Sequence, residues 1–108
     1  MKVEKSYFIY YRFSIKKNRK EIARAFLFLI NNDLHDEPYG LVEDVFVDES
    51  CRGEGRGTKI VKAVIAKARE LRCYKLIATS RFGRSKVHKI YLGLGFKKHG
   101  TEFRMELK

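Results

Sequence analysis

The first half of the chain alternates between short apolar runs and polar turns. Residues 7–14 are rich in aromatic and β-branched side chains, which is typical of a strand. Residues 21–30 would suit a helix by composition, but the segment is short and bounded by turns, which favours a strand paired in a hairpin. A third apolar run covers residues 41–47. The pattern therefore predicts three consecutive strands with antiparallel pairing.

The second half follows a helical period. Residues 55–71 are predicted to form a helix that turns its lysines and arginines toward water. Its apolar stripe consists of Ile60, Val61, Val64, Ile65, Ala68 and Leu71. A short strand over residues 74–79 precedes a second helix, which Ser85 can cap and Gly95 ends. The apolar face of this second helix carries Val87, Ile90, Tyr91 and Leu94.

The last segment, residues 96–107, is expected to complete the fold as one or two strands. The predicted order is then β-β-β-α-β-α-β, an α/β (α+β) fold with a mixed, mostly antiparallel sheet and a right-handed strand–helix–strand crossover. At 108 residues, the chain is expected to form a single domain, 1–108.

The composition excludes several classes of protein. Hydrophobic residues make up 44% of the chain, with 8 Phe and 6 Tyr, which argues against disorder. No apolar run is long enough to predict a membrane span, and the first residues lack the pattern of a signal peptide. Cys51 and Cys73 have no metal-ligand spacing and are too few for a disulfide framework. We therefore expect a cytoplasmic protein without a metal site.

The chain is strongly basic, with 24 Lys and Arg against 13 Asp and Glu and a formal net charge of +11. Such a field attracts polyanions, which include coenzyme phosphates, phosphorylated substrates and nucleic acid. The charges are spread along the chain, however, so a solvated basic surface explains them equally well.

A glycine-rich turn links the third strand to the first helix. Gly53, Gly55 and Gly57 stand at alternate positions, and Arg52 and Arg56 bracket the turn. The first amides of a helix have no intrahelical acceptor and carry partial positive charge, so this turn predicts a phosphate or pyrophosphate site. The G-x-G-x-G spacing fits neither the Walker loop nor the dinucleotide fingerprint.

Two motifs resemble one known family. The run Arg52-x-x-Gly55-x-Gly57 resembles the Arg/Gln-x-x-Gly-x-Gly/Ala signature of the GNAT superfamily of N-acetyltransferases. Residues 90–96 resemble the family's aromatic-Tyr-x-x-x-Gly-Phe segment, and residues 40–108 as a whole look like its core. Short matches at residues 41–45 and 73–75 also resemble the glucosamine-phosphate N-acetyltransferase branch.

The resemblance implies that acetyl-coenzyme A is the cosubstrate. The loop amides would bind its pyrophosphate, Val45 and Val47 would pair with the pantetheine arm, and the amide near Val45 or Phe46 would face the thioester oxygen. The implied coenzyme-binding set is Val45, Phe46, Val47, Arg52, Gly53, Glu54, Gly55, Arg56, Gly57 and Thr58. The acetyl group would pass directly to a primary amine of a small molecule or a protein, within a ternary complex.

Glu43 is the candidate general base. Strand alternation places it on one face with Leu41, Val45 and Val47, where desolvation would make a carboxylate a better proton acceptor. The alternative is that Glu43 lies near an exposed strand end or that a bulge turns it outward. Asp44, on the opposite face, is the competing carboxylate.

Tyr91 is the candidate acid for the leaving thiolate. Periodicity alone makes it a core aromatic, and the catalytic role comes from the resemblance. Cys51 lies beside the loop without an activating neighbour, so we interpret it as a small space-filling residue.

The start of the chain leaves two functions open. The strand and two helices that precede the core in typical members are not found here, so a catalytically degenerate acyl-CoA-binding or basic nucleic-acid-binding module is the alternative to an enzyme. The same feature would leave the strand at residues 7–14 as an exposed edge, with five aromatic side chains in seven positions. We therefore expect a homodimer that covers this edge.

Overall fold

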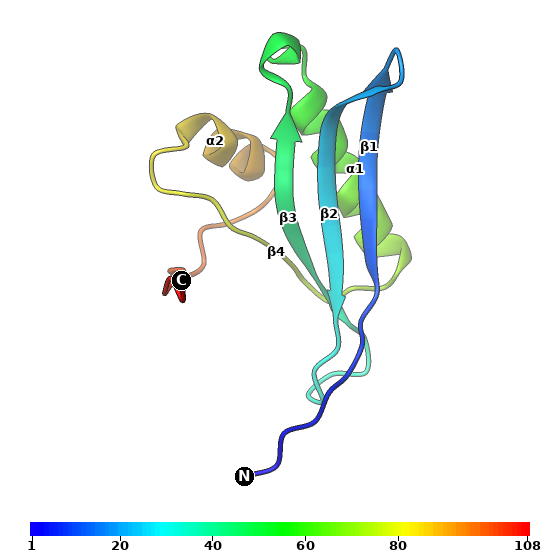
Figure 1. Cartoon of the computed structure of the whole chain (residues 1–108), viewed down its shortest axis with the longest axis vertical. Coiled ribbons are helices and arrows are strands. Elements are labelled where there is room, and N and C mark those ends of the chain that lie inside the picture. The colour runs from blue at the N-terminus through cyan, green and yellow to red at the C-terminus, as the bar shows by residue number, and fades with distance from the viewer. The chain divides into compact units, whose positions relative to one another are not determined.

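The computed structural model describes all residues, 1–108, and divides them into two compact units, Met1–Ala78 and Thr79–Lys108. The first unit contains a four-stranded sheet and the long helix, and the second contains the shorter helix (Figure 1). None of the helices is long and apolar enough to cross a membrane.

The sheet has the order β1-β2-β3-β4. β1 (Tyr10–Lys17), β2 (Lys20–Ile30) and β3 (Tyr39–Val47) pair antiparallel, and β4 (Leu76–Ala78) lies parallel to β3. Asn18 and Arg19, which join β1 to β2, have φ of 51° and 68°, as a tight hairpin turn requires. The mixed, mostly antiparallel sheet is confirmed, and residues 21–30 lie in a strand rather than a helix.

The core lies between one face of the sheet and α1 (Arg56–Glu70), which runs behind the sheet in Figure 1. Four members of the predicted apolar stripe are buried here, Ile60, Val61, Val64 and Ala68. β2 is the central strand and supplies alternate buried residues, Ala23, Ala25, Leu27 and Leu29. The stripe is thus confirmed as the helix face that forms the core, while Ile65 and Leu71 are only half-buried at its margin.

Gly40 allows β3 and β4 to approach each other closely. A Cβ atom at this position would lie 2.7 Å from Cδ1 of Leu76 and 2.8 Å from Cδ1 of Leu27. Both distances are well inside van der Waals contact, so a larger residue at this position would force both leucine side chains to move.

The second unit contains α2 (Ser85–Gly93). Its predicted apolar face is half-buried, and Gly95, with φ of 102°, ends the helix as expected. The amides of Phe96 and Gly95 donate to the carbonyls of Tyr91 and Leu92, at 3.0 and 3.2 Å, which is a Schellman ending. The predicted cap at Ser85 is wrong, because Arg84 holds the N-cap position and no side chain caps the helix.

The predicted final strand is also wrong, because residues 94–108 contain no strand. Phe103, Met105 and Leu107 do alternate with charged residues, and all three are exposed. Alternation is only half of what a strand requires, since an extended segment gains stability by pairing with a neighbour. The second unit offers no strand with which this segment could pair.

Candidate functional site

The glycine-rich loop joins β3 to α1 through a short 3₁₀ turn, Glu49–Cys51. Gly53 and Gly55 have φ of 83° and 77°, in the left-handed region that favours glycine, and a Cβ atom at either would meet no neighbour. Glycine is therefore required here for backbone conformation rather than for space. Gly57 differs, since it lies within the first turn of α1.

The loop leaves the first amides of α1 available. Gly55 is the N-cap and has no side chain to cap the helix, and the first helical bond runs from the amide of Lys59 to the carbonyl of Gly55, at 3.0 Å. The amides of Arg56, Gly57 and Thr58 consequently have no intrahelical acceptor. An anion at this end would receive hydrogen bonds and the favourable field of a helix of 15 residues.

The two arginines that bracket the loop are used to hold its shape. Nε of Arg52 donates to the carbonyl of Val47, at 3.0 Å, and Nη1 of Arg56 donates to the carbonyl of Cys51, at 3.1 Å. Arg56 also forms an ion pair with Glu54. The loop is therefore braced from within by its own two arginines.

Asp48 anchors the start of this connection. Its carboxylate accepts hydrogen bonds from the amide of Ser50, at 3.2 Å, and forms an ion pair with Nζ of Lys20, at 3.1 Å. The hydrogen bond from Lys20, followed by that from Ser50, lowers the pKa of Asp48 below its usual value. Asp48 thus ties the end of β3 to the β1–β2 hairpin.

β3 contains a bulge at Asp44. Glu43 pairs with Phe26 and Phe46 pairs with Arg24, so Asp44 and Val45 together lie opposite Ala25 alone. Asp44 has φ of 51°, which is uncommon for a residue other than glycine.

The surroundings of Glu43 differ from the predicted ones. Glu43 pairs with Phe26 on the sheet face that α1 does not cover, whereas Val47 pairs with the fully buried Ala23 on the helix side. Glu43 therefore does not share a face with Val47, and it is exposed rather than desolvated by apolar neighbours. Glu43 keeps the face of Leu41, and the bulge that follows it places Val47 on the opposite face.

The two candidate carboxylates differ in their contacts. Nε and Nη2 of Arg24 donate to Oδ2 and Oδ1 of Asp44, at 2.7 and 3.4 Å, and this interaction raises the pKa of Arg24. Glu43 makes no hydrogen bond or ion pair and points its carboxylate to solvent. Of the two, Asp44 has a paired carboxylate and Glu43 an unpaired one.

The edge of β3 that faces β4 is only partly used. β4 pairs with Gly40, Leu41 and Val42, and no strand continues the pairing beside the rest of β3. Val45, Phe46 and Val47 are half-buried on this stretch. An extended ligand could pair with the backbone there as an added strand does.

Tyr91 belongs to the second unit, where it is half-buried on α2. Its ring lies 5.2 Å from that of Phe96, centroid to centroid, and its carbonyl accepts the bond that ends the helix. The loop, Glu43 and the free stretch of β3 all belong to the first unit.

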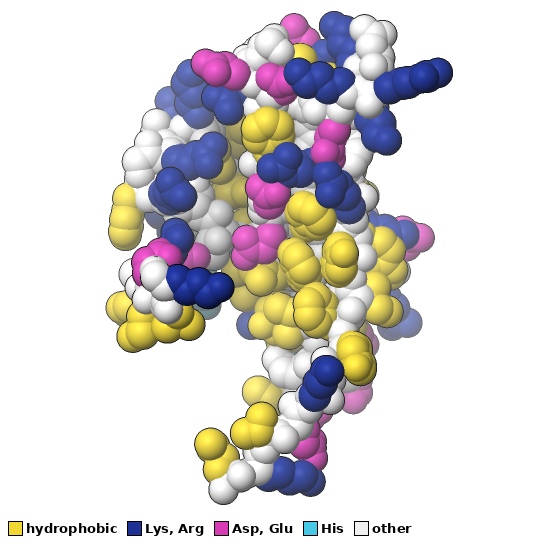
Figure 2. Space-filling model, viewed as in Figure 1, with side chains coloured by type: hydrophobic (Ala, Val, Ile, Leu, Met, Phe, Trp, Pro, Cys, Tyr) yellow, Lys and Arg dark blue, Asp and Glu magenta, His cyan; other side chains and the backbone are white.

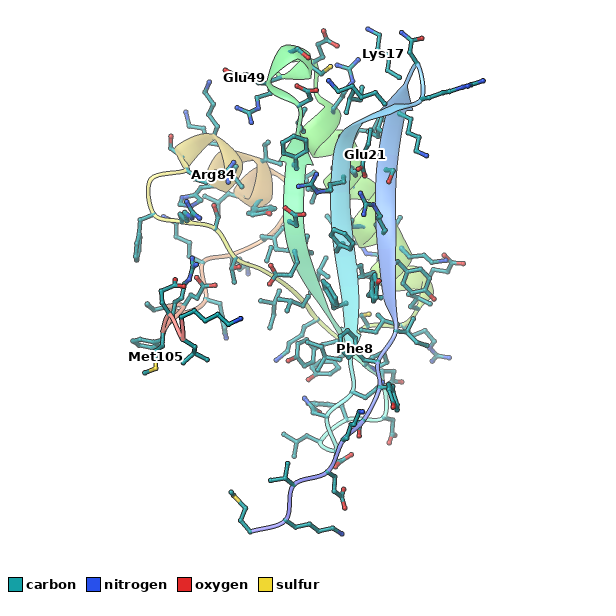
Figure 3. All side chains as sticks on the ribbon, in the orientation of Figure 1. Phe8, Lys17, Glu21, Glu49, Arg84 and Met105 are labelled. Atoms are coloured by element: carbon teal, nitrogen blue, oxygen red, sulfur yellow. The ribbon has the colours of Figure 1, made fainter.

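The uncovered face of the sheet carries an aromatic patch, made of Phe8, Tyr10, Phe26 and Phe28 (Figure 2). Arg12, Glu21, Arg24 and Asp44 form ion pairs on the same face. Figure 3 places Phe8 just before β1, at the opposite end of that strand from Lys17. Phe8 and Tyr10 are 63% and 56% exposed, so apolar surface remains open to water beside the edge strand.

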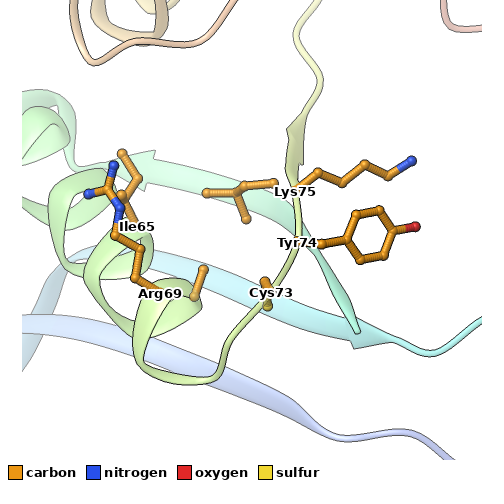
Figure 4. Close-up of a pocket in the computed structure, with 7 residues that line it drawn as sticks. Ile65, Arg69, Cys73, Tyr74 and Lys75 are labelled. Carbon is orange, nitrogen blue, oxygen red and sulfur yellow. The ribbon is translucent and has the colours of Figure 1, made fainter. Parts of the chain in front are cut away.

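A pocket of about 260 Å³ lies between the C-terminal half of α1 and the segment that leads into β4 (Figure 4). Ile65, Ala68 and Arg69 line one side, and Cys73 through Leu76 line the other. Burial raises the pKa of the Cys73 thiol. None of the predicted site residues lines this pocket, so the pocket is distinct from the glycine-rich loop.

Sequence reasoning missed Arg24, and it named a bulge only as an alternative placement of Glu43, not at Asp44. One signal was present, since aspartate is rare inside strands and tolerates positive φ better than most residues. The contact with Arg24 spans 20 positions of sequence and left no such signal.

Comparisons with known proteins agree on one family. The model described as the acetyltransferase (GNAT) family matches residues 3–96, which is most of the chain. A glucosamine 6-phosphate N-acetyltransferase of Trypanosoma brucei brucei is 37% identical over 68 residues, which are 63% of this chain and 44% of that protein. The chain spans less than half the length of the curated relatives it matches.

Solved structures share the fold. An acetyltransferase of Trypanosoma brucei, 27% identical, superposes over 93% of this chain and 69% of its own, with a TM-score of 0.79. The glucosamine-6-phosphate N-acetyltransferase of Arabidopsis thaliana has a TM-score of 0.83 over 92% of this chain and 67% of its own. At 20% identity, the second likeness concerns the fold alone.

Proposed function

Because this chain belongs to the acetyltransferase (GNAT) family, we propose that it is an N-acetyltransferase that moves an acetyl group from acetyl-coenzyme A to a primary amine. The observation that carries the proposal is the loop between β3 and α1, with left-handed glycines and free amides at the helix start. Coenzyme and amine bind together, and the acetyl group passes directly between them.

The coenzyme is proposed to bind along two elements. Its pyrophosphate accepts hydrogen bonds from the amides between Arg52 and Thr58, since a helix start of this kind is suited to phosphate. Its pantetheine arm lies beside β3 and pairs with Val45 and Val47, and the amide near Val45 or Phe46 faces the thioester oxygen. The unpaired edge of β3 beyond Val42 supports this placement.

Glu43 is proposed as the general base. The amine nitrogen forms a bond to the thioester carbon, the carbon–sulfur bond breaks, and the amine proton passes to Glu43 directly or through water. The ion pair between Asp44 and Arg24 supports the choice of Glu43 over its neighbour. The bound coenzyme and amine would supply the desolvation that the exposed carboxylate lacks in the free chain.

Tyr91 is proposed as the acid that gives a proton to the departing thiolate. Support comes from the segment around it, which ends α2 as the family motif requires, with Gly95 in the left-handed region. The ring of Phe96, tilted at 52° to that of Tyr91 and 5.2 Å from it, restricts the orientation of the tyrosine ring.

The acceptor is proposed to be a small amine, with amino sugar phosphates tested first. The curated relatives from Trypanosoma brucei brucei and Oryza sativa subsp. japonica are described as a glucosamine 6-phosphate N-acetyltransferase and a probable one. The net charge of +11 favours an anionic acceptor. A protein amine is the alternative acceptor.

The chain is also proposed to form a homodimer through β1. This strand is one of the two edges of the sheet, and the residues at its start, Tyr7, Phe8, Ile9 and Tyr10, are each more than half exposed. Exposed edges and apolar patches of this kind favour association with another chain.

The test is a turnover assay with acetyl-coenzyme A and a panel of amines that includes glucosamine 6-phosphate, unphosphorylated amino sugars, polyamines and peptide N-termini. Chromatography follows the release of coenzyme A and the acetylated product. We expect release that depends on the amine. Binding of acetyl-coenzyme A without turnover of any amine would favour a degenerate binding module, and no binding would contradict the proposal.

A further inference from the structure

The bulge in β3 forces an unfavourable backbone conformation on Asp44. Its φ of 51° brings the side chain of an ordinary residue close to its own backbone, so this conformation needs support from its surroundings. The residues on either side of Asp44 both have proposed roles in acetyl transfer. Glu43, the proposed base, precedes Asp44, and Val45, which is proposed to pair with the coenzyme, follows it.

Arg24 on β2 holds two residues of this bulge at once. Its guanidinium donates to both carboxylate oxygens of Asp44, at 2.7 and 3.4 Å, and lies over the ring of Phe46, 4.5 Å from the centroid. Arg24 also pairs with Phe46 in the register of the sheet. The side chain therefore spans the bulge from Asp44 to Phe46, with Val45 between them.

We propose that Arg24 is a positioning residue for acetyl transfer, which fixes the β3 bulge through Asp44 and Phe46 and so orients Glu43 and the backbone at Val45. This inference rests on the proposed function. Arg24 itself contacts neither proton nor thioester, and it acts through the backbone that it holds. Displacement of catalytic groups by about 1 Å can lower a rate by roughly 10²-fold, so the loss of this support should appear in turnover.

The sheet provides a matched control. Arg12 on β1 pairs with Glu21, with Nε and Nη2 at 3.2 and 2.5 Å from the carboxylate oxygens, and its guanidinium lies 5.2 Å from the ring centroid of Phe26. Like Arg24, Arg12 contacts a carboxylate and a phenylalanine ring on the uncovered face of the sheet, but it does not contact the bulge. Both pairs are exposed, and exposed ion pairs contribute little to folding. Arg24→Met and Arg12→Met should therefore both fold.

The experiment compares these two variants with the unsubstituted chain. For Arg24→Met we expect kcat to fall by about 10²-fold, with the Kd for acetyl-coenzyme A within a few-fold and a melting temperature close to that of Arg12→Met. Arg12→Met should keep its kcat. Asp44→Gly should restore part of the rate when combined with Arg24→Met, because glycine adopts positive φ without support. Equal losses in both arginine variants, or an unchanged kcat in Arg24→Met, would overturn the inference.

Amide hydrogen exchange at Val45 and Phe46 tests whether Arg24 holds the bulge, and it does not depend on turnover. We expect faster exchange at both amides in Arg24→Met than in Arg12→Met, and equal exchange would overturn the inference. An unsubstituted chain that acetylates no amine would contradict the proposed function instead, and the exchange rates would then decide by themselves whether Arg24 holds the bulge.

Discussion

At the scale of single residues, Glu43 and Asp44 separate two roles that adjacent carboxylates could otherwise share. The bulge gives Asp44 a positive φ and an arginine partner, and it leaves Glu43 unpaired on the uncovered face of the sheet. Asp44 is thus held by the backbone and by Arg24, while the carboxylate proposed for proton transfer is that of Glu43.

The first prediction concerns the base. Glu43→Gln keeps the size of the side chain but cannot accept the amine proton, so kcat should fall by roughly 10²–10⁴-fold. Affinity for acetyl-coenzyme A should change little, because the phosphates bind at the loop. Steady-state kinetics and calorimetry measure the two quantities.

Glu70→Gln is the control for this substitution, since Glu70 is an exposed glutamate at the far end of α1 and should have no effect on turnover. Wild-type rates in Glu43→Gln at every pH would remove Glu43 from the mechanism and leave water or the substrate to carry the proton.

At the scale of elements, the sequence predicts those parts whose cause is local. The hairpins follow from alternating runs and turns, the core face of α1 follows from helical spacing, and the end of α2 follows from Gly95. The bulge at Asp44 depends on a side-chain contact with Arg24, 20 positions away, and the brace depends on hydrogen bonds from Arg52 and Arg56 to carbonyls within the loop connection. No periodicity signals such contacts.

The last predicted strand failed for a related reason. Residues 96–107 contain an alternating pattern, but the pattern does not say which strand would pair with it, and pairing is what stabilises a strand. In the same way, strict alternation through residues 41–47 predicts that Glu43 shares a face with Val47. The extra residue at the bulge reverses the faces beyond it, so the two residues lie on opposite faces.

A second prediction concerns the link between the β1–β2 hairpin and the loop. The hydrogen bond from Lys20 lowers the pKa of Asp48, so an NMR titration should give a midpoint below the usual aspartate value of about 3.9. Because folding lowers this pKa, the contribution of Asp48 to stability is fully present when the pH is above the usual pKa of an aspartate. It is lost as the pH falls through the lower, folded-state value.

Removal of the lysine tests the cause of that shift. Lys20→Met should raise the midpoint of Asp48, while Lys17→Met, at the exposed end of β1, should leave it unchanged. A midpoint at or above the usual value in the unsubstituted chain would refute the anchoring role.

At the scale of the whole molecule, the third prediction is a homodimer. Burial of Tyr7, Phe8, Ile9 and Tyr10 against a second copy would remove exposed apolar surface and pair the free edge of β1. Light scattering after size exclusion should give twice the 12.7 kDa mass of the chain at tens of micromolar.

Phe8→Lys and Tyr10→Lys together should shift the mass toward the monomer, because two added charges would lie in the contact. A single 12.7 kDa species for the unsubstituted chain would contradict the proposed dimer.

The central claim is that the loop between β3 and α1 binds the pyrophosphate of acetyl-coenzyme A, and calorimetric titration of loop variants tests it most directly. Gly57→Asp places a carboxylate at the free amides of the helix start, where repulsion should weaken binding by about 10²-fold or more. Gly100→Asp adds the same charge at an exposed glycine of the second unit, where a Cβ atom would meet no neighbour. This variant should bind acetyl-coenzyme A as the unsubstituted chain does. Equal affinity in all three proteins, with thermal unfolding showing that each is folded, would contradict the account.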